Sequence, residues 1–209
     1  MPRGSEELTH ARKEEIIRAC ASLYETMSFK DITIKEIGAA TSFTRTSIYN
    51  YFQTKEEIFL ALFQQEYEEW TSELEQVTRE NEAMTTDELA QVLAHSLEKR
   101  GMLLKLLSMN LYDMEENSRL ERLVSFKTAY GDSIRAVSEL LEKFCPQMDA
   151  AERQRFIFSF FPFIYGVYPY TAVTEKQRAA MDAAGVDFAY LSVYQLVYDC
   201  AKKLLTSAS

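Results

Sequence analysis

Hydrogen-bond donors and one cation are concentrated between Thr44 and Phe52, where the sequence reads T-R-T-S-I-Y-N-Y-F. Arginine is the commonest side chain to bind the O6 and N7 atoms of guanine, and hydroxyl groups bind the phosphate oxygens of DNA. The stretch therefore has the chemistry of a nucleic-acid contact. A polar surface turn beside a small core has the same composition, so the elements that carry the stretch must decide between the two interpretations.

These elements, and those of the whole chain, are predicted to be helical. The 209 residues include 6 glycines and 4 prolines, fewer than sheets joined by tight turns usually require. Segments with helical apolar spacing follow capping boxes at Thr33/Glu36, Thr54/Glu57, Thr85/Glu88, Ser118/Glu121 and Asp149/Glu152. We expect an all-α fold with helices near residues 7–27, 33–40, 44–51, 54–79, 86–99, 101–111, 118–145, 150–168 and 187–206, and a short one near 175–183.

The first three of these helices are arranged as a DNA-binding unit. Helices 33–40 and 44–51 are too short to be stable alone, so they need a core shared with helix 7–27. The turn 41–43 between them gives the layout of a helix-turn-helix unit. Because such a unit inserts the start of its second helix into the major groove, residues 44–52 lie where DNA is read.

The first turn of this second helix is expected to contact base pairs. Thr44 is placed to cap the helix, and Arg45 and Thr46 follow in its first turn, within reach of base edges. Ile48 and Phe52 are expected to anchor the helix in the core.

Other polar residues are expected to contact the DNA backbone. The hydroxyls of Ser47, Tyr49 and Tyr51 suit phosphate oxygens, and Thr33 is similarly placed at the start of the preceding helix. Lys55 lies in the first turn of the next helix, where a cation is a poor match for the helix dipole. We therefore expect Lys55 to bind a group outside the protein.

Residues 33–59, T-I-K-E-I-G-A-A-T-S-F-T-R-T-S-I-Y-N-Y-F-Q-T-K-E-E-I-F, strongly resemble the DNA-binding head of the tetracycline-repressor (TetR) family. The shared signature includes Ile37-Gly38, Ser47-Ile48-Tyr49, Tyr51-Phe52 and the lysine of Thr54-Lys55-Glu56, and the resemblance covers about residues 9–60. Two positions depart from the family pattern. The turn is Thr41-Ser42-Phe43 instead of Ala-Gly-Val, and Ser28 replaces a common glycine.

The resemblance implies a dimeric, all-helical transcription regulator. Members usually repress, bind near-palindromic operators with two heads, and release DNA when a small molecule binds the C-terminal domain. It implies a DNA-binding domain at residues 1–55 and a helical ligand-binding and dimerisation domain at residues 56–209. Carried over by position, the DNA-facing set is Thr33, Thr44, Arg45, Thr46, Ser47, Tyr49, Asn50, Tyr51 and Lys55.

The charge is divided between these two parts. Residues 1–55 hold eight Lys/Arg and seven Asp/Glu, whereas residues 56–209 hold fifteen and twenty-five. The acidic C-terminal part argues against a general polyanion binder, while the N-terminal part remains free to meet a phosphate backbone.

Apolar surfaces in the C-terminal part predict a homodimer. Residues 156–170 are apolar on every side, which predicts a fully buried helix, and Pro162 is expected to kink it near the Phe158 carbonyl. The last helix has two apolar stripes, one for its own chain and one for a partner chain. The predicted interface residues are Phe161, Tyr168, Tyr190, Tyr194 and Val197.

Aromatic and methionine side chains predict a mostly apolar ligand pocket, with plain core packing as the alternative. Arg100, Lys105, Arg119 and Arg122 lie near this region and can recruit an anion or form a solvated face. The predicted pocket residues are Met109, Tyr112, Phe126, Tyr130, Phe160, Phe163 and Tyr165.

An enzyme is not expected. The two histidines, His10 and His95, lie outside any Glu-x-x-His pair, and the sequence has no Cys-His ligand spacing, nucleophile elbow or phosphate-binding glycine loop. We expect no catalytic residue, metal or cofactor. The three cysteines are far apart, no apolar run is long enough for a membrane span, and the N-terminus lacks an apolar signal core, so a cytoplasmic protein is expected. Two alternatives stay open: a family relative that recruits a protein partner, and a repressor without an inducer.

Overall fold

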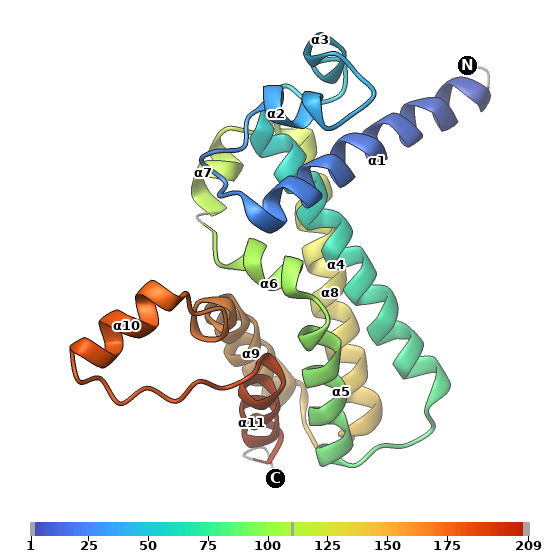
Figure 1. The fold of residues 1–209 in the computed structure, drawn as a ribbon. Coiled ribbons are helices and arrows are strands. Elements are labelled where there is room, and N and C mark those ends of the chain that lie inside the picture. Colours follow the sequence, from blue (N-terminus) through green and yellow to red (C-terminus); the bar gives the residue numbers. More distant parts are fainter. Residues whose placement is uncertain (1–2, 110, 207–209) are drawn as a thin grey trace. The chain divides into compact units, whose positions relative to one another are not determined.

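The computed structural model describes residues 3–109 and 111–206, and every regular element among them is an α-helix (Figure 1). This confirms the predicted all-α fold. In chain order the helices are α1 (Arg3–Thr26), α2 (Ile34–Ala39), α3 (Arg45–Ile48), α4 (Lys55–Glu80), α5 (Thr86–Glu98), α6 (Gly101–Leu107), α7 (Leu111–Glu116), α8 (Leu120–Phe144), α9 (Ala150–Thr171), α10 (Glu175–Ala183) and α11 (Val193–Thr206).

The chain divides into two compact units. The first comprises Met1–Tyr67 and Asn110–Tyr130, and the second comprises Glu68–Met109 and Gly131–Ser209. The first unit therefore combines α1 to α3 with the start of α4, with α7 and with the start of α8. The domain boundary predicted between residues 55 and 56 stays a prediction.

The core of the first unit is built from the N-terminal helices. Ile16 of α1, Ile37 of α2 and Ile48 of α3 have no exposed surface. Phe59 of α4 meets the Tyr24 ring edge-on, with 5.1 Å between centroids. These contacts supply the shared core without which helices as short as α2 and α3 would not form.

The second unit is centred on Trp70. Its indole is fully buried, and Nε1 donates a hydrogen bond to Ser96 Oγ of α5 at 2.9 Å. Phe161 of α9 packs against the indole with 5.9 Å between ring centroids. Capping boxes start α5 at Thr85 and α9 at Asp149, as the sequence predicts.

Three predicted helices differ from those observed. The predicted helix 187–206 is replaced by α11, which begins at Val193 after Ser192 Oγ accepts from the Gln195 N–H. The predicted helix 101–111 ends early, because α6 stops at Leu107; its residue 110 lies outside the described residues. The second half of the predicted helix 44–51 is a turn, since α3 ends at Ile48.

The α9 helix is not buried all round, as its sequence led us to expect. The helix continues through Pro162, while Phe158 is 70% exposed and Pro162 and Tyr170 are also at the surface. The apolar residues of α9 therefore lie partly in the core and partly on an exposed face of the helix. No single described helix is long and apolar enough to cross a membrane; α9 and α10 pass that test only together, bent by 86°.

Candidate nucleic-acid interface

Hydroxyl groups shape the turn between α2 and α3. Thr41 Oγ1 donates to the Gly38 carbonyl at 3.0 Å and accepts from the Phe43 N–H at 3.3 Å. The Ser42 N–H donates to Glu15 Oε1 at 2.6 Å, and this bond holds the pKa of the Glu15 carboxyl below its ordinary value. The polar turn is therefore fastened to α1 by a charge-assisted hydrogen bond.

Gly38 lies at the closest approach of α2 to α3. A Cβ at this position would lie 3.5 Å from Arg45 Cα, Arg45 N and Ile48 Cδ1. These are ordinary van der Waals distances with little space beyond them, so the position requires a small residue. The buried Gly38 thus allows the start of α3 to pack on α2.

The α3 segment has one buried and one exposed side. Ile48 and Phe52 are 0% and 1% exposed, which confirms them as anchors. The Thr44 side chain accepts from the Ser47 N–H at 3.3 Å and so caps α3, as predicted. The predicted contact residues Arg45, Thr46, Tyr49 and Asn50 are exposed, as are Thr33 and Thr44, while Ser47, Tyr51 and Lys55 are half-buried.

Two cations lie against tyrosines at this face. Arg45 donates to the Tyr49 hydroxyl at 3.3 Å, with its guanidinium 5.9 Å from the ring centroid. Arg12 of α1 donates to the Tyr51 hydroxyl at 3.1 Å. Arg12 is not among the residues predicted from the sequence, because 39 positions separate it from Tyr51 and only the fold brings the two together.

Lys55 has partners inside the protein. Its Nζ donates to the carbonyls of Phe29, at 2.7 Å, and Ile32, at 3.0 Å, and lies 4.1 Å from the Phe29 ring centroid. The position of this cation therefore does not require a group outside the protein, because the loop after α1 supplies acceptors that offset the unfavourable helix dipole. An ammonium has three N–H donors, so a contact with DNA stays a prediction.

Two arginines, one just before α8 and one in its first turn, hold the segment that follows α3. Arg122 donates to the Tyr51 carbonyl at 2.9 Å, and its guanidinium lies 5.1 Å from the Phe52 ring centroid. Arg119 forms an ion pair with Glu57 at 2.6 Å. These two arginines bind groups of their own unit, so the predicted recruitment of an anion is not needed to explain them.

The residues predicted to line a ligand pocket are divided between the two units. Tyr112, Phe126 and Tyr130 belong to the first, and Met109, Phe160, Phe163 and Tyr165 to the second. Phe126 is 1% exposed and packs 5.0 Å from the Phe63 centroid, whereas Tyr112 is 83% exposed. Phe160 is fully buried among aromatic rings of α9. Core packing, the alternative interpretation, thus accounts for Phe126 and Phe160.

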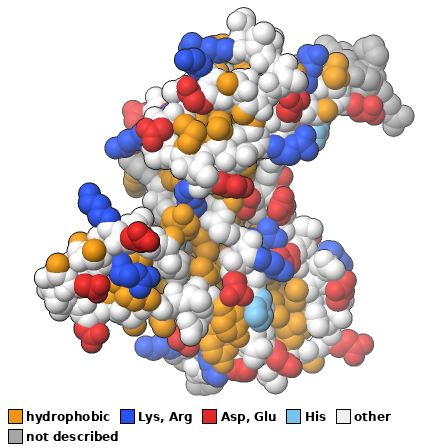
Figure 2. All heavy atoms as spheres, in the orientation of Figure 1, with side chains coloured by type: hydrophobic (Ala, Val, Ile, Leu, Met, Phe, Trp, Pro, Cys, Tyr) orange, Lys and Arg blue, Asp and Glu red, His pale blue; other side chains and the backbone are white. Residues whose placement is uncertain are grey.

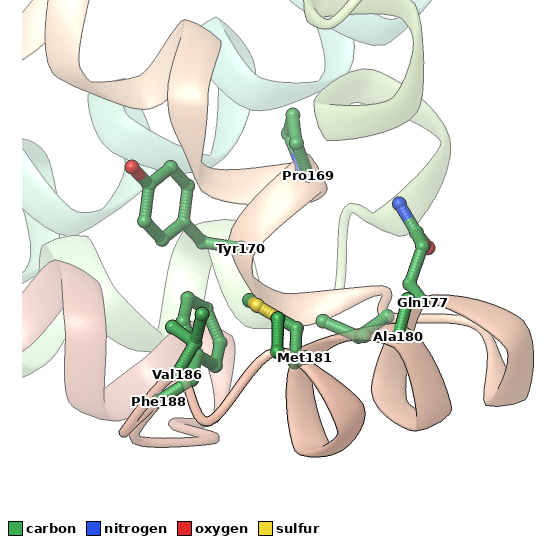
Figure 3. A pocket seen from close by; sticks show the side chains of 9 residues that line it. Pro169, Tyr170, Gln177, Ala180, Met181, Val186 and Phe188 are labelled. Carbon is green, nitrogen blue, oxygen red and sulfur yellow. The ribbon is translucent and has the colours of Figure 1, made fainter.

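A cavity of about 470 Å³ lies elsewhere, beside α10 (Figure 3). Its walls are the end of α9 with Pro169 and Tyr170, the face of α10 with Gln177 and Met181, and the segment that carries Phe188. None of the seven predicted pocket residues borders it. The lining residues come from three consecutive segments, the end of α9, α10 and the segment after α10. Helical spacing in the sequence does not predict that these segments enclose a cavity.

Two of the predicted interface residues are core residues. Phe161 and Val197 are 2% and 0% exposed within the single chain, so the prediction that they face a partner was wrong. Tyr168 and Tyr194 are half-buried, and Tyr190 is 38% exposed with Arg178 over its ring at 3.8 Å.

Two family models match this chain and identify its protein family. Residues 16–62 match the model of bacterial regulatory proteins of the tetR family, and residues 64–192 match that of the tetracyclin repressor-like C-terminal domain. The chain belongs to the TetR family. This TetR-family protein is therefore a DNA-binding transcription regulator and not an enzyme.

Solved structures share the fold of this TetR-family protein at low identity. A putative TetR-family regulator from Mesorhizobium loti MAFF303099 aligns with a TM-score of 0.62 and 15% identity, over 99% of this chain and 96% of that one. FadR from Bacillus subtilis, in complex with stearoyl-CoA, gives 0.61 and 14%, over 94% and 99%. The SmeT–triclosan complex gives 0.59 and 17%, over 94% and 91%. No curated protein matches the chain.

Proposed function

We propose that this TetR-family protein is a homodimeric, cytoplasmic repressor that binds a near-palindromic operator and is released by a small molecule. The observation that carries the proposal is the two-sided α3 segment. Ile48 and Phe52 anchor one side of the segment in the core, and Arg45, Thr46 and Tyr49 are exposed on the other side. Residues of these types at the start of the second helix suit base edges and phosphates.

The exposed apolar surfaces of α9 and α11 support a dimer. Phe158 of α9 is 70% exposed, and Val193, Leu196 and Leu204 of α11 are only half-buried. Figure 2 shows hydrophobic side chains at the surface over α9, α10 and α11. Apolar surface that remains exposed on a single chain is typical of an interface, and two heads joined in this way would match a near-palindromic site.

Release by a small molecule is supported by relatives. One solved structure of FadR contains stearoyl-CoA and one of SmeT contains triclosan. SmeT is the repressor of the Stenotrophomonas maltophilia multidrug efflux pump SmeDEF. By analogy, we propose that this protein also represses a gene and responds to a largely apolar effector.

A gel shift with DNA from upstream of the protein's own gene tests the proposal. The expected result is a retarded band that weakens as salt rises, because binding releases counterions from the phosphates. Sedimentation of the same sample should show a dimer. A folded dimer that shifts no such DNA even at low salt would rule out operator binding at that site and favour a protein-partner role.

A further inference from the structure

The cavity beside α10 has the size of a small-molecule site. Its volume of about 470 Å³ falls within the range of roughly 300–1,000 Å³ that is usual for ligand pockets. All of its lining residues belong to the second unit, so its shape depends on that unit alone. It is widely open to solvent, which gives a ligand direct access.

The lining is apolar and partly aromatic. The rings of Tyr170 and Phe188 lie 5.9 Å apart with 30° between their planes, and Met181 lies on the α10 wall. A nearly parallel pair of rings next to a flexible thioether suits a flat apolar molecule. No lining residue is charged, which disfavours an ionic ligand.

The α10 wall is weakly held by the rest of the protein. None of the nine residues of α10 is buried, although Ala180 and Met181 of the helix, and Ala184 just after it, line the cavity with small or apolar side chains. A nine-residue helix is marginal without packing. A ligand in the cavity would bury this face and stabilise α10.

Gln177 supplies one oriented polar group. Its Oε1 accepts from the N–H and the hydroxyl of Thr174, both at 2.9 Å, as part of the capping box of α10. This network fixes which end of the amide is oxygen, and the NH₂ is left turned away from the cap. Figure 3 shows the Gln177 nitrogen on the side toward Pro169. Gln177 thus presents an amide N–H donor at the edge of the cavity.

We propose that this cavity binds a flat, uncharged, apolar small molecule that carries one hydrogen-bond acceptor for the Gln177 amide. The inference rests on the proposed ligand-responsive function, which it deepens by assigning the site and the ligand class. A second copy of the chain that covers the same groove is the competing occupant, and the test separates the two.

Nile red is a suitable probe, because it is flat and uncharged, has a carbonyl acceptor, and fluoresces in apolar surroundings. We expect it to bind the full-length protein. Ala180→Trp fills the cavity and should abolish binding. Ala179→Trp is the matched control, since Ala179 is also exposed on α10 but does not line the cavity.

Gln177→Glu tests the hydrogen bond to the ligand. The variant keeps an oxygen for the cap but removes the donor, and it should weaken Nile red binding by about fivefold, the value of one hydrogen bond.

Far-ultraviolet circular dichroism checks that each variant is folded, and sedimentation records its oligomeric state. Equal Nile red binding by Ala180→Trp and Ala179→Trp would place the dye elsewhere and overturn the inference. So would a loss of the dimer in Ala180→Trp alone, because the groove would then belong to the subunit interface. Operator binding is measured separately: its absence in the wild type refutes the proposed function, while the dye titration still decides the site.

Discussion

Arg119 binds the buried carboxylate of Glu57 with three hydrogen bonds. Its Nε donates to Oε1 at 2.6 Å, a terminal guanidinium nitrogen donates to Oε2 at 2.9 Å, and its backbone N–H donates to Oε1 at 3.2 Å. Glu57 lies in the first turn of α4 and has no exposed surface. Thr54 adds a hydrogen bond to the Asn117 carbonyl at 3.0 Å. The segment before α8 is therefore joined to the segment that follows α3.

The balance of forces on Glu57 favours its ionised form. Burial raises the pKa of this carboxyl. The hydrogen bonds from Arg119 and from the Gln53 N–H lower the pKa by more than burial raises it, so the net pKa lies below the ordinary value. Removing Arg119 would leave the buried Glu57 carboxylate without its main partner, and an unsatisfied buried acceptor typically costs about 1–3 kcal/mol. The Arg119 side chain is itself 36% exposed, so the cost stays below that of a fully buried ion pair.

We therefore predict that Arg119→Ala lowers the free energy of unfolding by about 1–3 kcal/mol, the cost of leaving the buried Glu57 carboxylate without this partner. Urea denaturation of the purified protein measures the change. Arg135→Ala on the exposed part of α8 is the control and should change stability by less than about 0.5 kcal/mol. Equal effects of the two substitutions would show that the Glu57 pair contributes little.

Lys55→Met should weaken the fold as well as DNA binding. The variant keeps the apolar stem but leaves the Phe29 and Ile32 carbonyls without the ammonium, and we expect a loss of about 2 kcal/mol in the free energy of unfolding. If the third N–H contacts a phosphate, affinity falls alike for all DNA sequences and the salt slope decreases by about one. An unchanged unfolding curve would contradict the structural role.

Arg45→Ala should weaken operator binding without weakening the fold. Arg45 is exposed and its hydrogen bond goes to the neighbouring Tyr49, so the substitution should leave the unfolding curve nearly unchanged. Loss of a bidentate base contact costs about 1–3 kcal/mol of operator binding and relaxes specificity at one base pair. Gel shifts with operators altered one base pair at a time measure this. Arg155→Ala removes the same charge from the second unit and serves as the control.

Local signals explain what the sequence predicted well. The caps at Thr33, Thr85 and Asp149 and the anchors Ile48 and Phe52 are encoded within a few residues, and each is found in the structure. The start of α11 carries a similar signal, because Ser192 and Gln195 exchange hydrogen bonds at the capping-box spacing. The capping partner here is a glutamine, whereas the capping boxes predicted from the sequence all end in glutamate.

Contacts between distant residues could not be predicted in this way. The partners of Lys55 lie 23 and 26 positions away, and Glu57 and Arg119 are separated by 62. Apolar composition also does not distinguish a core from an outer surface. Within α9, Phe158 and Phe161 are the same residue type, yet one is 70% exposed and the other 2%.

Acid stability should depend on Asp87 of α5, whose carboxylate joins α11 to α5 within the second unit. Its Oδ1 accepts from Lys202 Nζ at 2.7 Å and from the Tyr198 hydroxyl at 2.6 Å, and Oδ2 accepts from Gln91 at 2.8 Å. Hydrogen bonds from Lys202, then Tyr198 and then Gln91 lower the pKa of Asp87 from 3.8 to about 2.

Because the pKa is lower in the folded state, the stabilisation is complete above the unfolded value near pH 4 and is lost as the pH falls through about 2. Asp87→Asn should therefore flatten the dependence of the unfolding midpoint on pH between about 4 and 2, and reduce stability at neutral pH. Thermal unfolding followed by circular dichroism across this range measures the effect. Asp182→Asn on the exposed α10 removes an equal charge and should leave the slope as in the wild type. If both variants keep the wild-type slope, the Asp87 contacts do not persist in solution.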